Sequence, residues 1–263
     1  MNLIKKMLVL VVGFTLILGM ITPGTAITYG DLDGDDHPYV GLMIADVNGN
    51  PAWRCSGTLI SSTVFLTAGH CTEGADGARV WFDSTESEIL AKGYPFGGAG
   101  AHEGTPELYP LYNPAAFFVA DVGVVILDVP VYMDTYGALP EVDQLDALAR
   151  RRGNQDVTFT AVGYGLQRIN PVFVTAVRTR MVSNPHLVQI NTPGFTGDFS
   201  LLLSNNATTG GTCFGDSGGP NFLGDTNVVA GVTSFGLNGN CAGTGGIFRM
   251  DRAGPLDWVT SFL

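Results

Sequence analysis

Gly215-Asp216-Ser217-Gly218-Gly219-Pro220 is the most informative stretch of this sequence, and two shorter motifs precede it in the chain. The first is Thr67-Ala68-Gly69-His70-Cys71, and the second is Asp121, which opens an apolar run that ends at Leu127. A serine hydroxyl is a weak nucleophile at neutral pH, so it needs a nearby base, and that base needs a third group to orient it. Histidine, aspartate and serine follow one another in this chain in an order that suits base, orienting acid and nucleophile.

These motifs together resemble the chymotrypsin/trypsin-like serine proteases, and the resemblance spans essentially the whole chain after residue 26. It implies an all-β fold of two six-stranded antiparallel β-barrels packed against each other, with a C-terminal helix. Residues 27–263 would form this protease domain, with an N-terminal barrel over about 27–135 and a C-terminal barrel over about 150–250. The active site would lie between the barrels.

The hydrophobic pattern independently favours an all-β protein, because short apolar segments alternate with Gly, Asn, Pro and Asp. Residues 142–152 and 254–263 are the exceptions, with a helical pattern, and the Gly-rich residues 93–104 indicate a surface loop. The predicted strands are 39–45, 58–66, 78–82, 122–127, 157–162, 172–181, 187–190, 200–203, 228–234 and 246–250.

The first 26 residues have the composition of a secretory signal peptide. Lys5 and Lys6 precede an uncharged run from Met7 to Ile21, and small residues up to Ala26 suit a signal-peptidase cut. A membrane anchor is the alternative, but the run is shorter than the roughly 20 residues that a bilayer span needs. We therefore expect a secreted, extracellular protein with no stable membrane association after cleavage.

The charge balance argues against nucleic acid as a partner, since phosphate binding needs clustered Lys and Arg. The formal net charge of −11 becomes −13 when Lys5 and Lys6 are removed with the leader. The sequence contains no cofactor motif, and no CxxC or His/Cys cluster with the spacing of a metal site. We expect a monomer that acts on polypeptides without cofactor or metal.

Four cysteines in an exported chain favour two disulfides, and the sequence alone allows three connectivities. The resemblance selects Cys55 with Cys71, and Cys213 with Cys241. The first bond would fix the turn that holds His70, and the second would brace the loop that holds Ser217.

The resemblance also assigns roles at the site. Ser217 would be the nucleophile and His70 the general base and then acid, because the pKa of imidazole lies near working pH. Asp121 would orient His70, with Asp128 at the far end of the same apolar run as its rival. The backbone N–H groups of Gly215 and Ser217 would form the oxyanion hole.

Asp216 has a separate role in this resemblance, since its carboxylate would pair with the α-ammonium of a mature N-terminus. The matching motif is Ile27-Thr28-Tyr29-Gly30, directly after the expected signal cut, although Tyr29 stands where the family motif usually has glycine. Signal peptidase would then create the activating amine itself.

Substrate preference is predicted from the pocket that receives the residue before the scissile bond. The resemblance, aligned through Cys213, implies that the floor of this pocket is Gly211, which offers no charge for Lys or Arg. Its walls would be Ser234, Phe235 and Gly236, with Gly246 on the far side. The sequence thus predicts a serine endopeptidase that cleaves after large apolar residues. A catalytically silent binding protein and an esterase or narrow-specificity protease are the alternatives.

Overall fold

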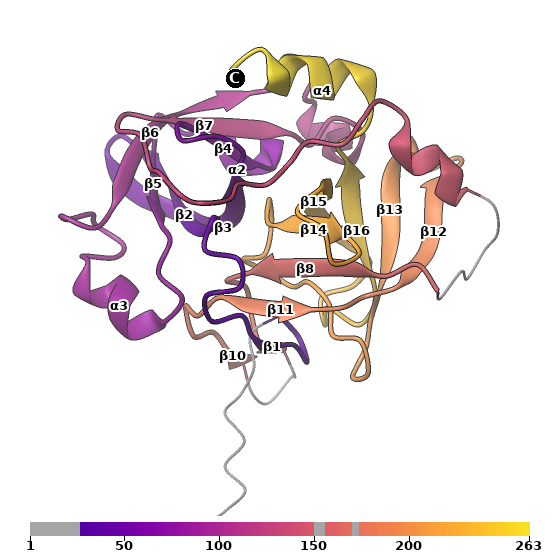
Figure 1. Cartoon of the computed structure of the whole chain (residues 1–263), viewed down its shortest axis with the longest axis horizontal. Coiled ribbons are helices and arrows are strands. Elements are labelled where there is room, and N and C mark those ends of the chain that lie inside the picture. The colour runs from indigo at the N-terminus through magenta and orange to yellow at the C-terminus, as the bar shows by residue number, and fades with distance from the viewer. Residues whose placement is uncertain (1–26, 150–155, 170–173) are drawn as a thin grey trace, which may run out of the picture.

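Six strands from the first half of the chain close into a barrel in the order β2-β3-β4-β7-β6-β5, with antiparallel pairing throughout (Figure 1). The structure is a computed structural model that describes residues 27–149, 156–169 and 174–263, so the expected signal peptide lies outside the described residues. The barrel strands are β2 (Val40–Val47), β3 (Asn50–Leu59), β4 (Val64–Thr67), β5 (Gly77–Trp81), β6 (His102–Leu108) and β7 (Gly123–Leu127).

The second half forms an antiparallel sheet in the order β1-β11-β8-β14-β15-β16-β13-β12. Only three residues separate β11 from β12, and a backbone bridge between Thr158 and His186 joins them back to the start of β8. Pro185, which has no N–H to donate, lies in the short break between β11 and β12, and its carbonyl accepts a hydrogen bond from the Phe159 N–H at 2.8 Å. The sheet consists of β1 (Asp31–Leu32), β8 (Phe159–Gly163), β11 (Met181–Ser183), β12 (Leu187–Thr192), β13 (Gly197–Asn205), β14 (Pro220–Leu223), β15 (Val229–Gly236) and β16 (Gly243–Arg249).

This return of the sheet to β8 makes the second barrel. β11 and β12 act as one interrupted strand, and β1 is an extra strand at the edge of β11. The all-β, two-barrel prediction is therefore confirmed. A separate two-stranded ribbon pairs β9 (Arg168–Ile169) with β10 (Val174–Thr175).

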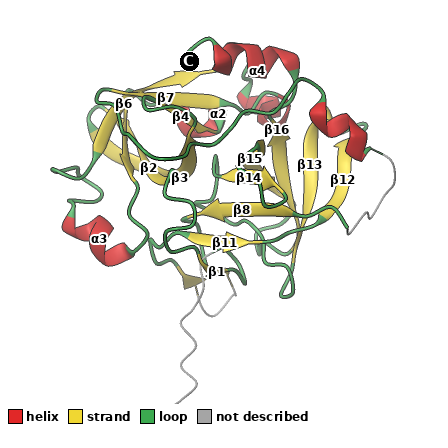
Figure 2. Ribbon diagram, viewed as in Figure 1, coloured by secondary structure: helices red, strands yellow, loops and turns green. Residues whose placement is uncertain are grey.

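Helices are short, and those at residues 86–91 and 253–260 lie at the periphery, whereas the one at residues 69–72 lies inside the molecule (Figure 2). The C-terminal helix predicted over 254–263 is present as α4, with Leu256 and Val259 buried and Leu263 exposed. In the described part of the helical pattern of 142–152, residues 142–149, the structure has one short 3-10 segment, η2. None of the helices in the described ranges is long and apolar enough to cross a membrane. The helical elements are α2 (Gly69–Thr72), α3 (Glu86–Ala91), η1 (Pro114–Val119), η2 (Gln144–Leu148) and α4 (Ala253–Thr260).

Strand boundaries differ from the sequence prediction where the positions of apolar residues do not indicate which residues pair with a neighbouring strand. The predicted strand 58–66 is two strands, β3 and β4, because the Ser61 hydroxyl accepts from the Thr63 and Val64 N–H groups in a turn between them. The predicted loop 93–104 ends inside β6, a strand with few apolar residues. Gly104 is required there, since a Cβ would lie 2.5 Å from the Ile126 carbonyl oxygen.

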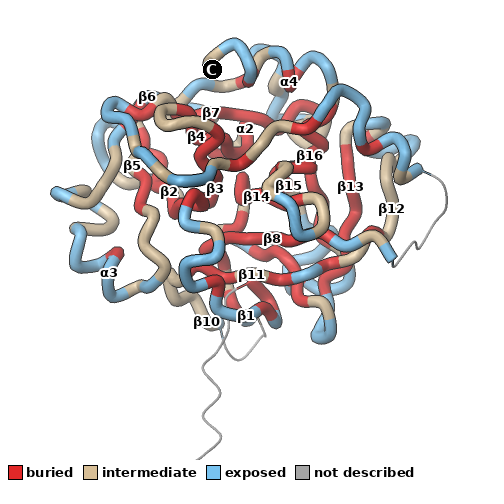
Figure 3. Tube along the Cα trace, viewed as in Figure 1, coloured by how far each residue is buried: buried red, intermediate tan, exposed pale blue. Residues whose placement is uncertain are grey.

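The main hydrophobic core spans both barrels, so the interface between them is buried (Figure 3). Val162, Phe222 and Phe248 of the second sheet belong to the same cluster as Leu42 and Phe65 of the first barrel. This packing fixes the distance between the facing edges of the two barrels. A site formed by residues from both barrels would lie at these edges.

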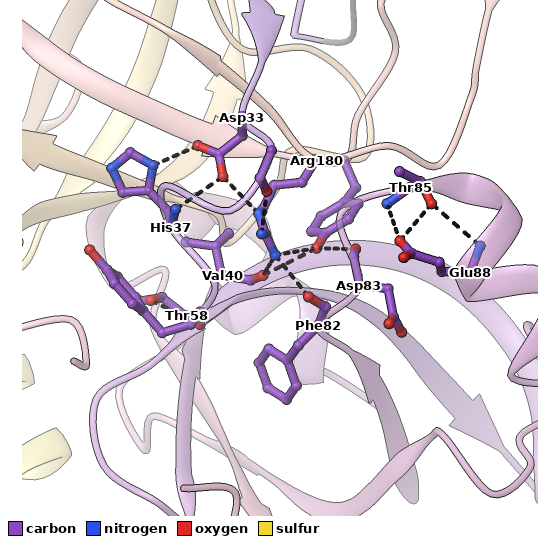
Figure 4. Close-up of polar contacts among 12 residues, drawn as sticks. Asp33, His37, Val40, Thr58, Phe82, Asp83, Thr85, Glu88 and Arg180 are labelled. Carbon is purple, nitrogen blue, oxygen red and sulfur yellow. Dashed lines mark hydrogen bonds and ion pairs between the residues drawn. The ribbon is translucent and has the colours of Figure 1, made fainter. Parts of the chain in front are cut away.

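A buried polar cluster ties the N-terminal segment to both barrels (Figure 4). The Arg180 guanidinium donates from Nε to Asp33 Oδ2 at 2.8 Å, and from Nη1 to the carbonyl oxygens of Phe82 at 2.8 Å and Val40 at 3.3 Å. His37 Nδ1 lies 2.5 Å from Asp33 Oδ1. Burying charged groups costs free energy unless they are paired and hydrogen-bonded. Every member of this cluster has such a partner.

Candidate active site

His70 and Asp121 meet at the rim of the first barrel. β4 ends at Thr67 and the one-turn helix α2 then carries His70, while Asp121 lies directly before β7, the partner of β4. His70 Nδ1 lies 2.9 Å from Asp121 Oδ2, and the His70 backbone N–H donates to Oδ1 at 2.9 Å. With Nδ1 facing the carboxylate, the other ring nitrogen, Nε2, is the one left to act as a base.

Asp121 is fully buried and has a further donor from the second barrel. The Ser234 hydroxyl on β15 donates to Oδ2 at 2.5 Å, so His70 and Ser234 together satisfy the carboxylate. Asp128, its rival in the sequence, is exposed beyond the far end of β7, where its N–H donates to the Glu103 carbonyl. The structure thus places Asp121 rather than Asp128 at His70.

Ser217 lies in a tight turn that two glycines make possible. Gly215 and Gly218 have φ of +96° and +78°, in the left-handed region that other residues rarely adopt, and a Cβ on Gly218 would collide with Thr67 Oγ1. The Ser56 backbone N–H donates to the Ser217 carbonyl at 2.8 Å. Neither the Gly215 N–H nor the Ser217 N–H has a hydrogen-bond partner among the described residues, so both donors are available to a ligand.

A cavity of about 510 Å³ opens beside Ser217 and His70. Among the residues the structure describes, the Ser217 hydroxyl makes no hydrogen bond to the His70 ring, although both groups line this cavity; such contacts commonly tighten when substrate binds. None of the lining residues is an aspartate or glutamate. They are His70, Phe117, Thr212, Cys213, Phe214, Ser217, Thr233, Ser234, Phe235, Gly236, Leu237, Asn238, Gly239 and Cys241.

Three of the predicted pocket residues line this cavity, namely Ser234, Phe235 and Gly236, whereas Gly211 and Gly246 do not. Thr212 takes the place predicted for Gly211.

Neighbouring side chains explain why Gly211 and Gly246 do not line the cavity. The Asn205 carboxamide occupies the space that a side chain at 211 would fill, and its Nδ2 donates to the Thr212 carbonyl at 2.7 Å. Gly246 is covered by the Phe235 ring, which a Cβ there would strike.

The two disulfides form as the resemblance implied, Cys55 with Cys71 and Cys213 with Cys241. The first links β3 to the helix of His70. The second joins the loop before Ser217 to the segment that precedes β16, so it closes one end of the cavity that both cysteines border.

The family model for trypsin matches residues 34–253, which is most of the chain. The chain belongs to the trypsin family. Its relatives include a collagenase of Hypoderma lineatum, 26% identical over 225 residues that cover 84% of this chain and 81% of the relative. Serine protease 1 of Drosophila melanogaster is 27% identical over 255 residues, covering 92% of this chain and 85% of the relative.

Solved structures of the same fold confirm the architecture. HL collagenase superposes with a TM-score of 0.68 at 21% identity, covering 90% of this chain and 98% of that one. Human heparin binding protein gives a TM-score of 0.64 at 17% identity, covering 89% and 96%. Since proteins with such different names share the fold, the fold alone does not decide what this trypsin-family chain does, and the site must be judged on its own residues.

Asp216 is fully buried, and two backbone N–H groups hold its carboxylate. Gly165 donates to Oδ1 at 2.7 Å and Cys213 donates to Oδ2 at 2.8 Å. Burial raises the pKa of Asp216 to about 7, against smaller lowering effects of these two donors and of Arg54. Among the described residues no cation lies within ion-pair distance of this carboxylate.

The side chain of Ile27 is fully buried, and its described contacts lead to Asp216 only through intervening residues. It packs with Ala161 of β8 and Met181 of β11, and Met181 is paired across the sheet with Gly163, against which Asp216 Oδ1 lies. In the full chain Ala26 still precedes Ile27, so the nitrogen of Ile27 is an amide rather than an ammonium.

Sequence reasoning missed three residues that the structure brings to the site. Ser56 donates its hydroxyl to the Gly215 carbonyl at 2.9 Å and so supports the turn, Asn205 backs the cavity wall, and Arg54 lies against Gly215. Ser56 and Arg54 flank Cys55, which is a positional signal, because the disulfide of Cys55 joins β3 to His70. Nothing in the sequence marks Asn205.

Proposed function

We propose that this trypsin-family chain is a secreted serine endopeptidase that cleaves after large apolar residues through an acyl-enzyme on Ser217. The observation that carries the proposal is the cavity shared by Ser217 and His70, which has aromatic walls and no carboxylate in its lining. Secretion is supported by the leader-like composition of residues 1–26.

In the proposed reaction the Ser217 hydroxyl attacks the carbonyl carbon of the scissile peptide while His70 Nε2 takes its proton. Asp121 keeps Nδ1 protonated and stabilises the imidazolium that forms. The negative charge on the carbonyl oxygen is met by the N–H groups of Gly215 and Ser217, which have no hydrogen-bond partner in the part of the chain that the structure describes.

Collapse of this intermediate breaks the peptide bond, and His70 passes its proton to the departing amine. The acyl group stays on Ser217. Water then attacks the ester with His70 again as the base, which releases the acid product and restores the serine.

Preference for apolar side chains follows from what the cavity offers. Phe214 and Phe235 supply apolar surface, and Lys or Arg would lose hydration without gaining an ion pair. Apolar pockets discriminate weakly, by about 1–3 kcal/mol per methylene. We therefore expect cleavage after Phe, Tyr, Leu and Met rather than after one residue.

Activation is proposed to follow from release of the Ile27 amine by the signal-peptidase cut. The buried Asp216 carboxylate has no cation among the described residues, and Ile27 packs against Met181, the strand partner of the Gly163 that lies against Asp216. A new α-ammonium would supply the missing charge and hold Gly215 and Ser217 in the donor geometry.

The acyl-enzyme is tested by treating the secreted protein with a fluorophosphonate and mapping the adduct. We expect a single label on Ser217, and Ser217→Ala should lower kcat on the order of 10⁶-fold. Label on another residue, or peptidase activity retained by Ser217→Ala, would contradict the mechanism.

The pocket is tested with a peptide-library cleavage profile of the wild type and of Thr212→Asp, which places a carboxylate in the cavity wall. The wild type should cleave after large apolar residues, and the variant should shift towards Lys and Arg. Thr208→Asp is the matched control, because Thr208 is exposed four residues away. A wild-type profile dominated by Lys or Arg would refute the proposed preference.

A further inference from the structure

Arg54 is a cation placed against the turn of Ser217, and no part of the mechanism above uses it. It lies on β3, opposite Ile44 of β2, and its side chain is half-buried. A Cβ built on Gly215 would lie 3.0 Å from Arg54 Nη2 and 3.1 Å from Nε. The guanidinium therefore rests on the same glycine whose N–H faces the reacting carbonyl in the proposed function.

Arg54 has no anionic partner within the described part of this acidic protein. Of the eight lysines and arginines that the structure describes, six form ion pairs and two, Arg54 and Arg168, do not. Arg168 is exposed, so water solvates it, whereas Arg54 is half-buried. A partly desolvated guanidinium gains from an anion that fits its planar fork of donors.

Asp216 is the acid on which Arg54 has an electrostatic effect, but the two side chains form no ion pair. The Asp216 carboxylate instead accepts hydrogen bonds from the N–H groups of Gly165 and Cys213. Arg54 acts on Asp216 only at a distance, where its charge lowers the pKa of that carboxyl by less than burial raises it. The guanidinium is left for an anion from outside the chain.

The position of Arg54 also decides which part of a substrate reaches it. Ser217 lies between the cavity wall formed by β15 of the second barrel and the β3 segment, where the Ser56 N–H holds the Ser217 carbonyl. Arg54 belongs to the β3 side and does not line the cavity. A peptide with the residue before the scissile bond in the cavity continues past Ser217 towards β3.

We propose that Arg54 binds a carboxylate on the substrate segment that follows the scissile bond, so that this enzyme favours acidic residues there. The inference rests on the proposed function. The carboxylate has two sources, an Asp or Glu side chain or the free C-terminus of a short peptide. Both are planar anions that the guanidinium can hold with two parallel hydrogen bonds.

The test compares peptides that share one large apolar residue before the bond and carry Asp, Asn or Ala at the first or second position after it. Each peptide is made with a free and with an amidated C-terminus, which separates the two sources. For wild type we expect kcat/KM to be about 5- to 10-fold higher for Asp or a free C-terminus than for the neutral match, with this ratio falling at high salt.

Arg54→Gln should bring that ratio to about one with little change for the neutral peptides, and Arg54→Lys should keep most of it. Arg168→Gln removes the other unpaired arginine and should leave the ratio as in wild type. A wild-type ratio near one overturns the inference. So does an equal loss for acidic and neutral peptides in Arg54→Gln, which would mean that Arg54 only supports the turn.

Failure of the proposed function would look different from failure of this inference. If no peptide is cleaved and fluorophosphonate does not label Ser217 of wild type, both proposals fall. If Ser217 is labelled and neutral peptides are cleaved normally, only the role of Arg54 is in question, and the ratio alone decides it.

Discussion

Two buried carboxylates, Asp33 and Asp216, meet the cost of burial in opposite ways. Asp33 has the Arg180 guanidinium and the His37 ring as partners (Figure 4), and although burial alone would raise its pKa, these two groups together hold the pKa below its usual value. Asp216 has only backbone N–H donors, and burial raises its pKa to about 7.

Among the described residues, the Asp33 carboxylate has a cationic partner and the Asp216 carboxylate has none. Asp33 has its partners within the folded chain, so its cluster stabilises the junction of the barrels under all conditions that keep it ionised. Asp216 lacks a cation among the described residues, and the segment that carries Asp33 begins at Ile27, whose amine we propose as that cation. The Asp33 cluster would then hold in place the N-terminal segment, whose Ile27 amine is the proposed cation for Asp216.

The largest expected effect comes from breaking the complete cluster. Arg180→Met should lower the free energy of unfolding by about 3–5 kcal/mol, because it leaves the Asp33 carboxylate buried without its cation. The measurement is denaturant unfolding at neutral pH. Arg178→Met is the matched control, since Arg178 pairs with Glu86 at a partly exposed position and should matter little. Equal stability of the two variants would contradict the role given to the cluster.

The second effect concerns the incomplete site. Asp216→Asn should lower kcat by about 10²- to 10³-fold, as expected when an oxyanion donor is lost, because the neutral amide cannot pair with the Ile27 ammonium. Fluorophosphonate titration of active sites should show folded but slowly reacting protein. Asp225→Asn, at an exposed turn, should behave as wild type. Full activity in Asp216→Asn would refute the proposed activation.

A third and smaller effect should appear in the pH dependence of two mature forms, one that begins at Ile27 and one that begins at Thr25. In the longer form Asp216 keeps its raised pKa, so its neutral state is favoured and stability is lost as pH rises from about 4 through about 7. The Ile27 form avoids this loss until its own amine, with a pKa raised above about 7.7–8.0, deprotonates.

The gap between the melting temperatures of the two forms should therefore open between pH 4 and 7, by about 2–4 °C for each kcal/mol, and close again at alkaline pH. Acetylated Ile27 should follow the longer form. Asp33 has the opposite sign in both forms, because its lowered pKa contributes stability that is lost as pH falls through it. A gap that stays constant with pH would show that the Ile27 amine does not reach Asp216.

The resemblance to the serine proteases anticipated that Ser217, His70 and Asp121 would meet at one cavity. The motifs around Ser217 and His70 carry that resemblance, whereas the choice of Asp121 depended mainly on the family pattern, because many aspartates at the start of a strand are turn residues. The strand β6 could not be anticipated, because the polar residues of His102–Leu108 face outward on a strand that is held by backbone pairing.

The pocket floor shows a different limit of sequence reasoning. The resemblance places the pocket floor at Gly211, but only the packing shows that the Asn205 side chain fills the space that a side chain at 211 would take, and that Thr212 lines the cavity. Arg180 is a similar case, since an arginine in a segment read as a strand gives no sign that it is buried until its partner Asp33, 147 residues away, is seen beside it.

The hydrogen bond from Ser234 to Asp121 makes assembly of the site depend on synthesis of nearly the whole chain. Asp121 is set in the first barrel, yet one of its donors lies 113 residues later, on a strand of the second. A chain truncated before β15 would carry His70 and Asp121 without that donor, and the buried Asp121 carboxylate would keep only its hydrogen bonds from His70. The half of the site that lies in the first barrel therefore depends on a residue of the second.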